Sequence, residues 1–173
     1  MSDHNKSSSS DSSWEKLAIP PNEYDVLVTD INETELEELG EKQEIGNLSA
    51  GFFSSPAFPV NGVIHSLNLR FMVCFVCRRA KKPSAPIVNI WFLLDTGSPH
   101  TYLTEKSMES LFGPGNAPPR QVDVAIQDPE IVIECHRSHD HFKEVNILGA
   151  NAILDLGFSI DIVNRKQFQL VKK

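Results

Sequence analysis

The chain has 173 residues, which is enough for one domain with a hydrophobic core but hardly enough for two. Its net charge of −7 is uneven, because residues 1–50 hold 3 basic and 12 acidic side chains (−9) whereas residues 51–173 hold 13 and 11 (+2). The nearly neutral remainder argues against nucleic-acid binding, and the lack of an apolar run of about 18–20 residues argues against a membrane span. A polar N-terminus and only three cysteines indicate a reducing, cytoplasmic compartment.

Residues 1–50 are predicted to form a disordered, acidic, serine-rich extension that precedes a folded domain of residues 51–173. Met1 to Ser13 has too few apolar side chains to offset the entropy of ordering. In the part from Trp14 to Asn47, Thr34 is a candidate cap for a short helix that runs to Glu44. The extension is interpreted as a solvated tail, and a docking segment for a partner is the alternative.

From Gly51 onward the chain consists of short β-segments separated by turn signals, with one or two short helices. Alternating apolar residues predict one long strand over Gly62 to Cys77, and an apolar run predicts another over Ile87 to Leu94. Helical spacing predicts two helical turns over Thr104 to Phe112. The remaining predicted elements are a hairpin (Gln121 to Ile126 with Ile131 to Cys135), a buried turn with a short helix (Val145 to Leu156) and a second hairpin (Phe158 to Val163 with Gln167 to Val171).

The most informative segment is the turn Asp95-Thr96-Gly97-Ser98, which follows the second apolar strand directly. Burying a carboxylate at the end of a strand is costly unless it is hydrogen-bonded, paired or functional. Gly97 permits a tight turn, and Thr96 adds a hydroxyl at the same point. On these residues alone, an ordinary Asp that caps a loop explains the pattern equally well.

A second segment, Ile147-Leu148-Gly149, changes that balance. Its glycine follows Asp95 by 54 positions and leads into a short apolar helix. This order of an apolar-apolar-Asp-Thr-Gly-Ser turn and a later apolar-apolar-Gly element resembles the retropepsins, the aspartic peptidases of retroviruses and retrotransposons. The resemblance covers roughly residues 58–171.

The loop Gly113-Pro114-Gly115-Asn116 stands where the retropepsin family has its flap, which covers the substrate. It is richer in proline than the usual flap tip. Asn151 is a second departure, because the family usually has Asp or Arg two positions after the glycine. These departures remove no catalytic group, but they bear on the dimer and on substrate preference.

The resemblance implies an all-β, closed barrel-like fold that is half of an active enzyme. Because the chain holds one Asp-Thr-Gly, it implies a homodimer in which the two Asp95 side chains meet and hydrolyse a bound polypeptide without metal or cofactor. Thr96 is expected to hydrogen-bond across the dimer interface, Gly97 to contact substrate or the partner's loop, and Ser98 to donate a hydrogen bond to the carboxylate. A non-catalytic dimerisation or peptide-binding module of the same fold is the alternative.

Other candidate sites are weaker. Cys135, His136, His139 and His141 cluster in sequence, but further ligands at suitable spacing are missing, which favours an exposed polar turn over a metal site. Cys74 and Cys77 lie in one predicted strand with side chains on opposite faces, which predicts buried or half-buried thiols.

Phe58-Pro59 matches the aromatic-proline pairs at which retropepsins often release themselves. The segment around it is expected to be extended and accessible. Self-cleavage at this bond, with the acidic extension as a pro-segment, is therefore a hypothesis. The alternative is that the pair begins the first strand.

Overall fold

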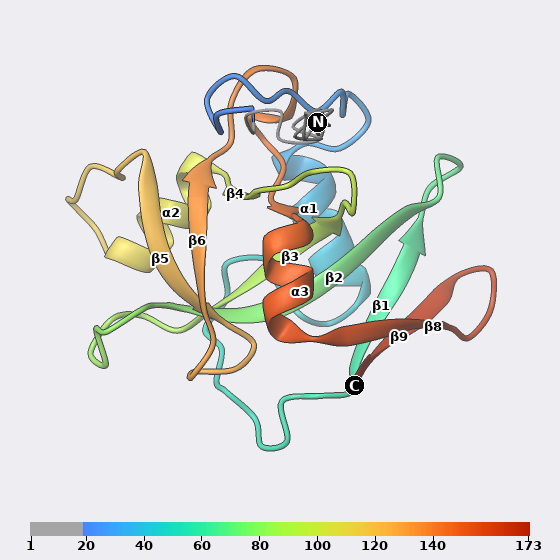
Figure 1. Ribbon diagram of the computed structural model, residues 1–173. Helices are drawn as coiled ribbons and strands as arrows, with labels where there is room; N and C mark the ends of the chain where they lie inside the picture. Colours follow the sequence, from blue (N-terminus) through green and yellow to red (C-terminus); the bar gives the residue numbers. More distant parts are fainter. Residues whose placement is uncertain (1–18) are drawn as a thin grey trace, which may run out of the picture.

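The computed structural model describes residues 19–173, which form a mostly β fold with three short α-helices (Figure 1). The prediction for Met1 to Ser13 lies outside the described residues. No helix in the described part of the chain is long and apolar enough to cross a membrane. The elements in chain order are α1 (Glu33–Lys42), β1 (Val60–His65), β2 (Arg70–Arg79), β3 (Val88–Leu94), β4 (Thr101–Leu103), α2 (Glu105–Phe112), β5 (Gln121–Ile126), β6 (Val132–Arg137), the 3₁₀ turn η1 (Asp140–Phe142), β7 (Ile147–Leu148), α3 (Ala150–Leu156), β8 (Phe158–Ile162) and β9 (Gln167–Lys172).

The strands form one sheet in the order β3-β7-β4-β6-β5-β2-β1-β9-β8, and a further pairing of β3 with β2 closes the first six into a ring. Within this ring β3 runs antiparallel to β2 and parallel to β7. β7 also pairs with β4, which is antiparallel to it. The short strand β7 therefore lies between the strand that leads into Asp95 and the strand that follows its turn.

Both faces of β3 are buried. Ile90 and Phe92 belong to the main hydrophobic cluster, whereas Trp91 and Leu93 belong to a second cluster on the other face. A strand that is buried on both faces appears in the sequence as a continuous apolar run rather than as an alternating one. This is why Ile87 to Leu94 was predicted as a strand, and the structure confirms it.

The described part of the predicted disordered extension is folded against the sheet. Val28, Ile31, Leu36 and Leu39 are almost fully buried in the second cluster. Each buried side chain of this size stabilises the fold by about 1.5–3 kcal/mol, which offsets much of the entropy lost by ordering this segment. The capping residue is Asn32, two positions before the predicted Thr34, because the Asn32 side chain accepts a hydrogen bond from the Glu35 amide (2.9 Å).

The predicted long strand over Gly62 to Cys77 is wrong, because it is two strands joined by a turn. Ser66 and Leu69 both have positive φ, at 59° and 53°, which breaks the extended backbone. Leu67 at the tip of the turn is 99% exposed. Alternation of apolar residues predicted the strands correctly but could not reveal the turn between them.

Phe58 is buried, contrary to the expected accessible segment. Its side chain is only 8% exposed and contacts the rings of Phe75 and Phe158 in the main cluster. An aromatic ring placed there stabilises the core. Cleavage at Phe58-Pro59 would therefore require this segment to leave the core first.

The remaining predicted elements are confirmed. Thr104 caps α2 by accepting a hydrogen bond from the Ser107 amide (3.1 Å). β5 pairs with β6, and β8 pairs with β9, as antiparallel hairpins. These elements depend on local signals, namely capping residues, alternation and turn residues.

Candidate active site

Asp95 stands directly after the buried strand β3. Its backbone N–H donates to the carbonyl of Leu148 (3.1 Å), and its carboxylate accepts a hydrogen bond from the Gly97 N–H (2.9 Å). Asp95 is half-buried, whereas Thr96 and Gly97 are exposed. The turn therefore orients the carboxylate through main-chain groups and presents its tip at the surface of the chain.

The apolar-apolar-Gly segment lies beside this turn. Ile147 and Leu148 form β7, parallel to the end of β3. Gly149 is needed for space, because a Cβ atom there would lie 2.0 Å from the His100 carbonyl oxygen. The amide after Gly149 donates to the carbonyl of Ser98 (2.7 Å). The two motifs therefore meet through main-chain contacts that only a glycine allows.

The predicted hydrogen bond from Ser98 to the Asp95 carboxylate is absent from the described structure, and the prediction was wrong. Ser98 is fully buried, and its hydroxyl donates to the carbonyl of His100 (2.7 Å). A serine in a turn commonly bonds to main-chain groups one or two residues away, because these acceptors are already in reach. Ser98 therefore ties the loop to itself and leaves the Gly97 amide as the donor to the carboxylate.

Thr101 joins the two motifs, although sequence reasoning did not single it out. Its hydroxyl accepts a hydrogen bond from the Gly149 N–H (3.1 Å) and donates to the side-chain oxygen of Asn151 (2.7 Å). The amide of Asn151 in turn donates to the Glu134 carbonyl (3.2 Å). An amide side chain serves as both acceptor and donor here, so Asn151 links Thr101 to β6.

Asn146 is the second residue that sequence reasoning missed. It is fully buried; its side-chain oxygen accepts from the Thr104 N–H (2.8 Å), and its amide donates to the Trp91 carbonyl (3.0 Å). These bonds connect β3 to the end of β4. A signal was present in the sequence, because a polar residue inside the apolar run from Val145 to Leu148 must find partners when it is buried.

The predicted flap residues belong to the loop between α2 and β5. Gly113 ends α2 with a φ of 81°, and the side chain of Asn116 turns back to donate to the Phe112 carbonyl (3.2 Å). Figure 1 shows this loop at the left edge of the molecule, between α2 and β5. None of Gly113, Pro114, Gly115 and Asn116 lines the cavity that contains Asp95.

That cavity has a volume of about 170 Å³. One wall is the end of β3, and another is the turn between β1 and β2. The third wall comes from the N-terminal segment of residues 19–31, here called the strap. The lining residues are Val26, Val28, Asn68, Leu69, Arg70, Phe71, Leu93, Leu94 and Asp95.

The strap also contacts the Asp95 turn directly. The hydroxyl of Tyr24 donates a hydrogen bond to the carbonyl of Gly97 (2.6 Å). Burial, with a smaller contribution from the nearby Asp95 carboxylate, raises the pKa of Tyr24, which keeps its hydroxyl a proton donor. The exposed face of the turn is thus partly covered by the chain itself.

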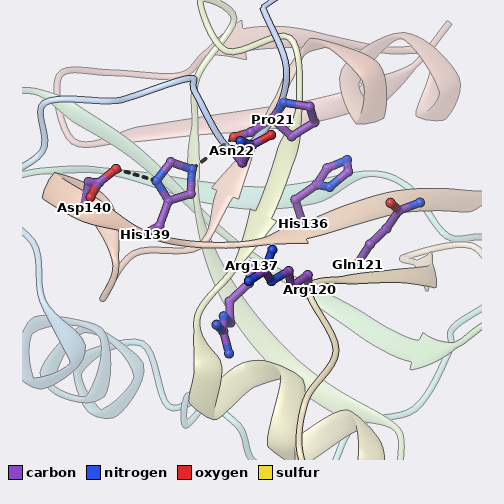
Figure 2. A pocket seen from close by; sticks show the side chains of 8 residues that line it. All are labelled: Pro21, Asn22, Arg120, Gln121, His136, Arg137, His139 and Asp140. Carbon is purple, nitrogen blue, oxygen red and sulfur yellow. Dashed lines mark hydrogen bonds and ion pairs between the residues drawn. The ribbon is translucent and has the colours of Figure 1, made fainter.

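The histidine cluster, which was predicted to be an exposed polar turn, also holds the strap. His139 donates to the carbonyl of Pro21 (3.0 Å) while its other ring nitrogen faces Asp140 (2.8 Å), as Figure 2 shows. The Tyr102 hydroxyl donates to the same Pro21 carbonyl (2.9 Å). Within residues 19–173 no group of three or more His, Cys, Asp or Glu side chains could hold a metal ion.

A larger hollow of about 610 Å³ lies beside residues Pro21 and Asn22 of the strap (Figure 2). The strap forms one wall, and β5, β6 and the following loop form the other. It is lined by Pro21, Asn22, Arg120, Gln121, His136, Arg137, His139 and Asp140. Because this hollow does not include Asp95, the smaller cavity is the candidate for carboxylate chemistry.

The cysteines are buried or half-buried thiols, as predicted. Cys77 lies in the main hydrophobic cluster, whereas Cys74 packs against the second cluster on the opposite face of β2. Burial raises the pKa of Cys74 to about 12. At neutral pH this thiol is not ionised, and it is therefore a poor nucleophile.

The chain is similar to proteins of known structure but not to known sequences. No protein-family model matches the chain, and no curated protein matches it. Five chains of solved structures match. One of them is a retropepsin-like aspartic protease from Rickettsia conorii; it is 19% identical, the match covers 66% of this chain and 90% of that chain, and the TM-score is 0.41.

Proposed function

We propose that this chain is an aspartic endopeptidase that acts on polypeptides as a homodimer. The observation that carries the proposal is the Asp95 turn. A half-buried carboxylate ends a buried strand and is oriented by the Gly97 amide, and the next two residues are exposed. β7 pairs with the end of β3, and Gly149 packs against the loop after Asp95. The order of these two motifs along the chain resembles that in the retropepsins.

The chemistry requires a second carboxylate. Two carboxylates about 3 Å apart cannot both ionise, so they share one proton, as the aspartic proteases in general illustrate. The ionised carboxylate accepts a proton from the attacking water. The protonated one donates a hydrogen bond to the scissile carbonyl oxygen.

A second copy of the chain would supply that carboxylate. The turn Asp95-Thr96-Gly97 occurs once in the sequence, and its tip is exposed rather than buried in the core. In a twofold dimer each copy presents the same turn, so the two Asp95 side chains can face each other. Thr96 is then placed to hydrogen-bond between the two turns.

The test is hydrolysis of an unstructured polypeptide at pH values between about 4 and 6, with and without a pepstatin-type inhibitor. Asp95→Asn should abolish hydrolysis while folding is unchanged, since the two side chains have the same shape. Asp161→Asn is the matched control, because this exposed carboxylate lies on β8, at the opposite end of the strand order from β3. Full activity of Asp95→Asn would refute the proposal.

A non-catalytic peptide-binding module remains the second candidate, because Tyr24 of the strap already occupies the Gly97 carbonyl. The same experiment separates the two functions. A well-folded dimer that binds peptide but neither hydrolyses it nor binds the inhibitor would favour the module.

A further inference from the structure

The strap crosses the Asp95 cavity as an extended segment. From Tyr24 to Asp30 its residues alternate in burial, with the even positions turned toward the body and Asp25, Leu27 and Thr29 exposed. Val28 is 2% exposed, whereas its neighbour Leu27 is 72% exposed. This period of two is the pattern of a peptide whose alternate side chains enter successive pockets.

Side-chain contacts hold the strap in this position. No residue between 19 and 31 belongs to a strand. Its bonds to the rest of the described chain include those from Tyr24 to Gly97, from Pro21 to His139 and Tyr102, and from Asp25 to His141 (2.6 Å). Figure 1 shows the strap crossing the top of the molecule beside the loop that follows β6. A segment held in this way resembles a bound ligand more than a strand of the sheet.

The end of the cavity holds a receptor for a carboxylate. Arg70 binds both oxygens of Asp30, with Nη2–Oδ1 and Nε–Oδ2 distances of 2.7 Å and 3.0 Å, and Asn68 donates to Oδ2 (2.7 Å). Arg70 and Asn68 also line the cavity that contains Asp95. The two-pronged geometry selects a carboxylate specifically, because a guanidinium matches its two oxygens in one plane.

We infer that the surface beneath the strap, formed by the end of β3 beside Asp95 and the start of β2, is a cleft for an extended peptide and that the strap occupies it in cis. The ligand class is an extended peptide with four side chains at every second position: one aromatic, two branched apolar and one acidic, in that order. Tyr24, Val26, Val28 and Asp30 provide this pattern within the chain. The inference rests on the proposed function, since it names the substrate class of that site, and it implies that the strap leaves before a substrate enters.

The test measures binding and does not require hydrolysis. The protein tested is the full chain with the substitutions Tyr24→Phe and Asp30→Asn. These remove the hydrogen bond from Tyr24 to Gly97 and leave Arg70 without its carboxylate partner. The probe is a fluorescein-labelled peptide of residues 22–32, compared with the same peptide in which Asn replaces the aspartate at position 30 and Asp25 is kept. Anisotropy at pH 7 gives the two affinities, and hydrogen exchange reports on the backbone of residues 24–31.

We expect the acidic peptide to bind at least about tenfold more tightly than its Asn counterpart, because charge-assisted hydrogen bonds are lost. Adding Arg70→Gln should abolish this preference. Adding Arg165→Gln, which changes an exposed arginine in the turn between β8 and β9, should preserve it. Equal affinities for the two peptides, or no binding of either, would overturn the inference.

Unchanged hydrogen exchange over residues 24–31 in the doubly substituted chain would also overturn it, because the strap would then be part of the core. A chain that discriminates between the peptides but hydrolyses no polypeptide would retain this cleft and refute only the protease. Active hydrolysis without discrimination would do the reverse.

Discussion

Gly149→Ala tests the contact between the two motifs of the candidate site. The backbone at Gly149 has a φ of −84°, which alanine adopts without strain, so the substitution changes only the space that is filled. The added methyl would lie 2.0 Å from the carbonyl oxygen of His100 and 2.9 Å from that of Ser98. Carbon–oxygen contacts are normally about 3.3 Å or longer, so the loop must move by about 1 Å.

That movement has a cost that follows from the structure. It stretches the hydrogen bonds from the Ala150 amide to Ser98 (2.7 Å) and from the Gly149 amide to Thr101 (3.1 Å). Each contributes about 1 kcal/mol, and overpacking in a filled interior costs a further 1–3 kcal/mol or so. The free energy of unfolding should therefore fall by about 3–5 kcal/mol, a large part of the roughly 5–15 kcal/mol typical of a domain.

Urea unfolding followed by the fluorescence of the buried Trp91 measures this change. Gly46→Ala is the matched control, because a Cβ atom there would meet only Ser49, at 3.5 Å and 3.7 Å. The control should change the free energy of unfolding by less than about 0.5 kcal/mol. If Gly149→Ala lowers the free energy of unfolding no more than Gly46→Ala does, the close contact of Gly149 with the loop of Ser98 and His100 is refuted. If the proposed function holds, a loop displaced by about 1 Å should also reduce hydrolysis about 100-fold.

Two further predictions concern the polar contacts. Asn146→Ala should lower the free energy of unfolding by about 2–5 kcal/mol, because it removes the side-chain partner of the buried Thr104 amide and of the Trp91 carbonyl. Urea unfolding of this variant and of the exposed control Asn61→Ala measures the difference, and equal unfolding midpoints would contradict the prediction. The hydrogen bond from Arg70 lowers the pKa of Asp30 to about 2, below the value of about 3.9 for an unfolded chain, so this pair stabilises the fold above about pH 4 and its contribution is lost as pH falls toward 2. The free energy of unfolding should therefore fall less steeply between about pH 4 and 2 in Asp30→Asn than in the unsubstituted chain, and parallel curves would refute this role of the pair.

Sequence reasoning succeeded where a signal lies within a few neighbouring residues. Thr104 caps α2 because a hydroxyl at that point reaches an amide three residues away. The apolar run that forms β3 is visible because both faces of the strand are buried. The two segments that the sequence singled out, the Asp95 turn and Ile147-Leu148-Gly149, do lie side by side, at the ends of the paired strands β3 and β7.

Sequence reasoning failed where a side chain had several possible partners. Ser98 could have donated to the Asp95 carboxylate, but the His100 carbonyl on the same turn is its acceptor. Asn146 and Thr101 are polar residues next to apolar ones, and only the packed structure shows which main-chain groups they satisfy. A hydroxyl or amide bonds to whichever group the fold brings within about 3 Å, and composition does not specify that group.

The strap illustrates best how far composition and residue pattern predict this fold and where packing between distant segments takes over. Acidic composition and few apolar side chains predicted a solvated extension, and on average the segment has that character. The sequence did contain the alternation of Val26, Val28 and Asp30, but a pattern of period two becomes a buried face only if a complementary surface is present. That surface is built by the end of β3, the turn before β2 and the loop after β6, which are distant in the chain and meet only when the sheet has formed.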